Sequence, residues 1–120
     1  MSYPSSTIVL NGKSIIIETG RFGSQASGAV TVRCGDTIVL ASVVASKRVK
    51  EGIDYFPLSL EYQEKLYSAG IISSSRFIKR EGRPSDEAVL SARIIDRTIR
   101  PLFNQALRND IQVVATVLAM

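Results

Sequence analysis

The sequence predicts an α+β fold in which one helix covers one face of a sheet. Four or five strand-like runs come first, a single amphipathic helical segment follows, and another strand-like run ends the chain. A length of 120 residues is sufficient for one small domain. The composition, with 45% apolar and 22% charged residues, is typical of a packed globular protein and not of a disordered chain.

Two predicted hairpins make up the first part of the sheet. Asn11-Gly12 joins the first pair of strand-like runs, and this residue pair best tolerates the positive φ angles of a type I′ turn. The second hairpin turns at Gly35-Asp36, and its later strand is apolar on both faces, which places it at the centre of the sheet. The four runs are residues 7–10, 13–19, 29–34 and 37–45.

Loops and one half-buried strand come next. Alternating apolar and polar residues predict a strand over 57–62, whereas the glycine-rich segment 20–28 and the charged segment Ser46 to Gly52 are predicted loops. No periodicity holds over 63–84, which predicts a long connection of the kind that is usually functional or mobile. A final strand is expected to begin at Asp110.

The helix is predicted from about Asp86 to Arg100. Ser85 is a good N-cap residue, and the carboxylates of Asp86 and Glu87 suit the positive end of the helix dipole. Pro101 is expected to end the helix, because its ring would clash with the carbonyl four residues earlier. Its apolar side, which should pack on the sheet, consists of Ala88, Ala92, Ile95, Ile99 and Leu102, with Ser91, Ile94 and Thr98 at the edge.

Composition excludes several classes of function. The chain has no histidine, which excludes a Ser-His-Asp triad, a Cys-His pair and a His-ligated zinc site built within it. Cys34 is the only cysteine, so no intrachain disulfide can form, and its expected role is that of a small buried apolar residue. No apolar run is long enough to cross a bilayer and no basic secretory signal opens the chain, so we expect a cytoplasmic protein.

Three arginines follow a helical spacing on the predicted helix. Arg93, Arg97 and Arg100 have i, i+4, i+7 spacing, which places three guanidinium groups on one ridge opposite the apolar side. Arginine forks can align with phosphates along a strand of nucleic acid. The alternative is a solvated face in which Asp96 pairs with Arg93 and Arg100.

The segment before the helix favours the nucleic-acid interpretation. It holds one aromatic ring, which could stack on a base, and four cations, which could neutralise phosphates. This combination is typical of proteins that bind single-stranded nucleic acid without sequence preference. A buried ring beside solvated charges is the alternative. The five residues are Arg76, Phe77, Lys79, Arg80 and Arg83.

Three long stretches resemble the first RNase PH-type domain of the bacterial polynucleotide phosphorylase family. The similarity is collinear from about Val9 to Met120, and REGRPS followed by IDR and IRPLF is its most specific part. A generic RNase PH or a related ring subunit shares fewer residues of the motifs DYFPL and YQEK. The stretches are ETGRFGSQASGAVTVRCGDTIVLASVVAS, DYFPLSLEYQEKLYSAG and FIKREGRPSDEAVLSARIIDRTIRPLF.

The resemblance implies a fold and an activity. The fold is RNase PH-like (ribosomal S5 domain 2-like), a mixed sheet packed against a helix, and residues 1–120 correspond to a truncated, N-terminal portion of the first domain. The family's activity is phosphate-dependent 3′-to-5′ degradation of mRNA, a polyribonucleotide nucleotidyltransferase reaction that releases nucleoside diphosphates. The second RNase PH-type domain, which carries the catalytic aspartates and Mg²⁺, is absent here, as are the KH and S1 domains. The resemblance therefore implies no catalytic or metal-binding residue in this chain.

The resemblance also implies partners and site residues. Single-stranded RNA is the implied ligand, inorganic phosphate the co-substrate, and a homotrimeric ring with degradosome-type partners the implied assembly. The implied RNA-binding residues are Phe77, Lys79, Arg80, Arg83, Arg93, Arg97 and Arg100.

This sequence departs from the family pattern at three places. Ile71 to Ser75 and Ile78 replace basic, glycine-containing and aromatic residues near the predicted RNA-binding loop, which should weaken base stacking. Thr98 stands where proline is usual and should favour helix continuity. The chain also ends before the rest of the first domain.

An alternative function is a non-catalytic ring subunit or assembly module that docks through its helix face and strand edges.

Overall fold

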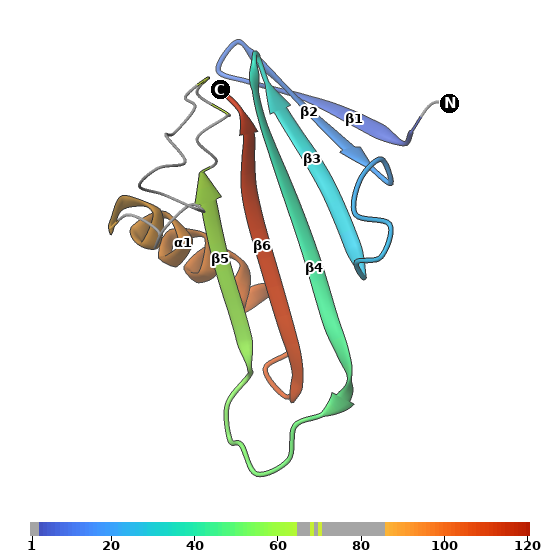
Figure 1. Cartoon of the computed structure of the whole chain (residues 1–120), viewed down its shortest axis with the longest axis vertical. Helices are drawn as coiled ribbons and strands as arrows, with labels where there is room; N and C mark the ends of the chain where they lie inside the picture. Colours follow the sequence, from blue (N-terminus) through green and yellow to red (C-terminus); the bar gives the residue numbers. More distant parts are fainter. Residues whose placement is uncertain (1–2, 65–67, 69, 71–85) are drawn as a thin grey trace, which may run out of the picture.

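The computed structural model describes residues 3–64, 68, 70 and 86–120. They form one six-stranded sheet in the order β1-β2-β3-β4-β6-β5, with one α-helix against it (Figure 1). The predicted α+β class is thereby confirmed. The elements are β1 (Ser5–Leu10), β2 (Lys13–Thr19), β3 (Gly28–Cys34), β4 (Thr37–Val49), β5 (Leu58–Glu64), α1 (Asp86–Ile99), the 3₁₀ helix η2 (Arg100–Leu102) and β6 (Asn109–Ala119).

Both predicted hairpins are present. Asn11 and Gly12 have φ angles of 51° and 76°, as a type I′ turn requires, and the turn sets Leu10 opposite Lys13. The second hairpin pairs β3 with β4 from Cys34 opposite Thr37 onward. β4 lies between β3 and β6, which confirms the central place predicted for this strand.

The sheet is mixed because β6 inserts between β4 and β5. It runs antiparallel to β4 and parallel to β5, and α1 is part of the crossover connection between β5 and β6. Figure 1 shows α1 crossing β5 on one side of the sheet. No helix among the described residues is long and apolar enough to cross a membrane.

The core lies between α1 and the β5–β6 end of the sheet. Phe56, Leu58 and Ile111 are its buried centre, and the rings of Phe56 and Phe103 lie 5.3 Å apart. Val43 on β4 packs at its border. The same sheet face continues over β2 and β3, where its apolar side chains are only half-buried.

Two local predictions are wrong. Residues Ser46 to Val49 extend β4 and are not a loop, because β6 gives them partners: Val49 pairs with Asn109, and the Asn109 side-chain amide donates to the Ser46 carbonyl at 3.0 Å. Leu102 was expected on the packed side of the helix but is 82% exposed. The chain changes to the tighter 3₁₀ winding at Arg100, which rotates Leu102 away from the α-helical stripe.

Candidate nucleic-acid interface

The inner face of α1 packs on β5 and leaves an outer face to solvent. Ala88 is buried, and Ala92, Ile95 and Ile99 on the same side are half-buried, as the spacing predicts. Asp86 and Glu87 occupy the first turn, where carboxylates stabilise the helix. The helix therefore presents its opposite side, which carries Arg93 and Arg97, outward.

Arg93 and Arg97 form the exposed part of the candidate interface, which we name the arginine ridge. Both residues are exposed, and they stand one helical turn apart. Within residues 3–64 and 86–120, neither guanidinium lies within ion-pair distance of a carboxylate, so Asp96 does not neutralise the ridge. The two guanidinium groups can therefore bind anionic groups from outside the described part of the chain.

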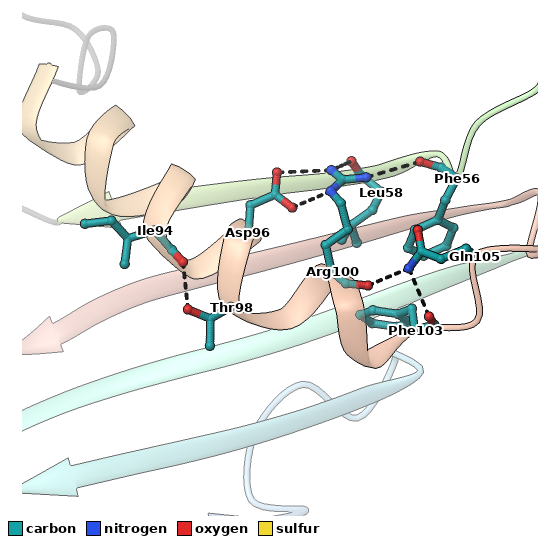
Figure 2. Close-up of polar contacts among 8 residues, drawn as sticks. All are labelled: Phe56, Leu58, Ile94, Asp96, Thr98, Arg100, Phe103 and Gln105. Carbon is teal, nitrogen blue, oxygen red and sulfur yellow. Dashed lines mark hydrogen bonds and ion pairs between the residues drawn. The ribbon is translucent and has the colours of Figure 1, made fainter.

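Arg100 is turned away from the exposed ridge, and the alternative prediction, its pairing with Asp96, is confirmed for this residue. Its Nε and Nη2 atoms donate to the two oxygens of Asp96 at 2.8 and 3.0 Å (Figure 2). Its Nη1 donates to the Phe56 carbonyl at 3.3 Å, and its Nη2 also donates to the Leu58 carbonyl at 3.1 Å. The guanidinium is turned inward toward β5 because four acceptor atoms converge there.

The Arg100 contacts cover the beginning of one edge of the sheet. In a strand, successive carbonyls point to opposite sides, and the Pro57 carbonyl accepts from the Ile111 N–H on β6. The carbonyls of Phe56 and Leu58 therefore point away from β6, to the free edge of β5. Arg100 satisfies both and fixes the C-terminal end of α1 on this edge, so it positions the arginine ridge without being part of it.

Two further side chains stabilise this end of the helix. The Thr98 hydroxyl donates to the Ile94 carbonyl at 2.9 Å, and α1 continues through Thr98, as the absence of proline there predicts. The Gln105 amide donates to the carbonyls of Arg100 and Phe103 at 2.8 and 3.0 Å, which supplies partners to the carbonyls at the helix end (Figure 2).

The predicted basic and aromatic loop lies outside the described residues. This applies to Phe77, Lys79, Arg80 and Arg83, and also to the predicted N-cap Ser85. The RNA-binding role of Phe77, Lys79, Arg80 and Arg83 stays a prediction from the sequence.

Tyr62 and Glu64 form a hydrogen-bonded pair on β5. The Tyr62 hydroxyl donates to Glu64 Oε1 at 2.8 Å. Burial first, and then the hydrogen bond and negative charge of Glu64, raise the pKa of Tyr62 above its ordinary value. The sequence signal for this pair was the i, i+2 spacing that puts both side chains on one face of β5, and our sequence reasoning missed it.

The described residues contain no cluster of metal-ligand side chains, and they line an apolar hollow beside η2. In residues 3–64, 68, 70 and 86–120, no three side chains of the Asp, Glu, Cys or His type gather as metal ligands. An open hollow of about 330 Å³ lies beside η2, but its lining is apolar and offers no group for catalysis. The lining residues are Val43, Ile99, Leu102, Phe103 and Val113.

Comparison with known proteins decides the family. Residues 11–120 match the model of the 3′ exoribonuclease family, domain 1, which is also the RNase PH family. The chain belongs to this family. The RNase PH-like fold implied by the resemblance is confirmed, and rice (Oryza sativa) Rrp46 shows the same fold at a TM-score of 0.61, with 15% identity over 98% of this chain and 46% of that one.

Members of the family with closer sequences share one name. The polyribonucleotide nucleotidyltransferases of Moorella thermoacetica and Heliobacterium modesticaldum are 55% identical to this chain over 114 and 109 residues, or 95% and 91% of it. The resemblance to the polynucleotide phosphorylase family is thus confirmed. This member of the 3′ exoribonuclease family spans about 15% of the length of those relatives.

Proposed function

We propose that this chain is an RNA-holding part of a phosphate-dependent 3′-to-5′ exoribonuclease, a polyribonucleotide nucleotidyltransferase of mRNA degradation. The observation that carries the proposal is the arginine ridge: Arg93 and Arg97 are exposed on a helix that Arg100 anchors to the sheet. Because the helix backbone is anchored, both guanidinium groups start from neighbouring positions one turn apart, and such forks can bind successive phosphates. Phe77, Lys79, Arg80 and Arg83 complete the proposed site from sequence alone.

Binding of poly(A) at several salt concentrations tests the proposal. Replacing Arg93 and Arg97 together by glutamine should weaken binding by roughly one order of magnitude at low salt, because two phosphate contacts and their counterion release are lost. The slope of log K against log salt should decrease in magnitude by about 1.4, since each single-strand contact contributes about 0.7.

A matched variant controls for net charge. The double variant Lys47→Gln, Arg48→Gln removes two exposed cations near the C-terminal end of β4, outside α1. It should leave the slope of log K against log salt unchanged. The proposal is overturned if the chain does not bind poly(A) at low salt, or if the two double variants weaken binding equally.

The catalytic step is proposed to need residues outside this chain. Inorganic phosphate would be the co-substrate and Mg²⁺ the metal of the longer relatives, but the described acidic residues do not gather into a site for it. Purified chain mixed with poly(A) and phosphate should therefore release no ADP, and steady ADP release would contradict this part. A homotrimeric ring, degradosome-type partners and a cytoplasmic location are proposed on the family resemblance alone.

A further inference from the structure

Two large apolar side chains are exposed beside the arginine ridge on the outer face of α1. Leu90 is 58% exposed and Ile94 is 69% exposed. They stand one helical turn apart, and we name them the apolar pair. A single exposed apolar residue is ordinary on a protein surface, but these two adjoin each other and the ridge. The outer face of α1 therefore combines apolar and cationic groups in one patch.

The helical spacing sets the apolar pair and the arginine ridge in two parallel rows. Leu90 precedes Arg93 by three residues, and Ile94 precedes Arg97 by three, so each apolar side chain neighbours one guanidinium group. Within each row the two side chains are four residues apart, which is a rise of about 6 Å along the helix axis. The result is a row of two cations beside a row of two apolar groups.

A single strand of nucleic acid has the complementary chemistry. Its phosphates follow one side of the strand, and the faces of its bases are accessible on the other side because they are unpaired. Among residues 3–64 and 86–120, no carboxylate pairs with Arg93 or Arg97, so their charge is available to phosphates. Asp86 and Glu87 lie one turn before Leu90 and would repel a phosphate there, whereas an uncharged base can occupy that end.

We propose that Leu90 and Ile94 are specificity-determining residues, through which the outer face of α1 prefers an unpaired RNA strand to a duplex. The arginine ridge binds two phosphates of the strand, and the apolar pair packs on the faces of the adjacent bases. A duplex offers phosphates to the same arginines, but its base faces are stacked inside and cannot reach the apolar pair. This inference rests on the proposed RNA-holding function and gives it a physical basis for choosing its ligand.

Glutamine substitution of the apolar pair tests the inference. The double variant Leu90→Gln, Ile94→Gln should weaken poly(A) binding roughly fivefold, which corresponds to the loss of about 40 Å² of buried apolar area. Because both arginines remain, the slope of log K against log salt should not change. Binding of a poly(A)·poly(U) duplex, and of inorganic polyphosphate, which has no bases, should equal that of the parent chain.

Two further variants serve as controls. Leu90→Met with Ile94→Leu keeps the apolar surface and should bind poly(A) as the parent chain does. Val9→Gln with Leu10→Gln removes two exposed apolar side chains from β1 and should also leave poly(A) binding unchanged.

A gain of affinity tests the same contact in the opposite direction. Leu90→Phe places an aromatic ring where we expect a base, and stacking should strengthen poly(A) binding by roughly three- to tenfold without changing polyphosphate binding. Unchanged or weaker poly(A) binding by this variant would show that Leu90 does not contact a base.

The outcomes separate this inference from the proposed function. If the double glutamine variant binds poly(A) as tightly as the parent chain, the inference is overturned, and a protein surface becomes the ligand to consider for the apolar pair. An equal loss of affinity for poly(A) and polyphosphate would also overturn it, because the apolar pair would then not act through bases. If the parent chain itself does not bind poly(A) at low salt, the proposed function fails and this inference fails with it.

Discussion

Replacing Arg100 by methionine should destabilise the chain by about 2 kcal/mol. Methionine keeps most of the aliphatic volume but removes a bidentate ion pair with Asp96 and two bonds to the carbonyls of Phe56 and Leu58. Hydrogen bonds to a charged group contribute about 1.5–3 kcal/mol when they are well shielded from water.

Solvent exposure lowers that value. The side chains of Arg100 and Asp96 are 36% and 32% exposed, so water screens the ion pair and can hydrate the freed carbonyls. We therefore assign about 1 kcal/mol to the ion pair and about 0.5 kcal/mol to each carbonyl bond.

Urea unfolding followed by circular dichroism measures this effect. The midpoint should fall at constant m, and the thermal midpoint should drop by about 8 °C, at about 4 °C per kcal/mol. In a double-mutant cycle with Asp96→Asn, the coupling energy should be about 1 kcal/mol. Substitutions of exposed residues without such contacts usually change the free energy of unfolding by less than about 0.5 kcal/mol. A loss no larger than this for Arg100→Met would refute the anchoring role.

Two further predictions concern the turns and β5. Gly12 and Gly23 have nearly equal φ angles of 76° and 72°, but a Cβ on Gly23 would meet the Ala29 Cβ at 2.8 Å and one on Gly12 would meet nothing within 4 Å. Unfolding experiments should therefore show that Gly23→Ala costs at least about 1 kcal/mol more than Gly12→Ala, and equal costs would contradict this geometry. Because the folded state raises the pKa of Tyr62, its contribution to stability should be full below about pH 10 and disappear as pH rises through the folded pKa. Glu64→Gln should lower the pH at which the Tyr62 phenolate absorbs, and an unchanged titration curve would count against the Glu64 contact.

Local signals in the sequence predicted those parts of the fold that depend on neighbouring residues. Asn11-Gly12 fixed the first turn, and Asp86, Glu87 and the apolar spacing predicted the helix almost to its last residue. The insertion of β6 between β4 and β5 depends on pairing between distant residues, such as Ile38 with Ala119, and no local pattern encodes it.

The candidate site was predicted only in part for the same reason. The spacing of Arg93 and Arg97 is sufficient to place both on the outer helix face. The i, i+4 spacing also suggested the pairing of Asp96 with Arg100, but the carbonyls of Phe56 and Leu58, which turn Arg100 inward, are more than 40 positions away in the chain.

The place of β6 in the sheet has a consequence for the order of folding. Strands β1 to β4 can pair successively as the chain emerges from the ribosome, because each is joined to its neighbour by a two-residue turn or by the loop 20–27. β5 has no hydrogen-bonded neighbour in the sheet until β6 has been synthesised and has entered beside β4. The late entry of this strand requires closure of a long loop, so we expect it to limit the refolding rate and to follow the formation of the two hairpins.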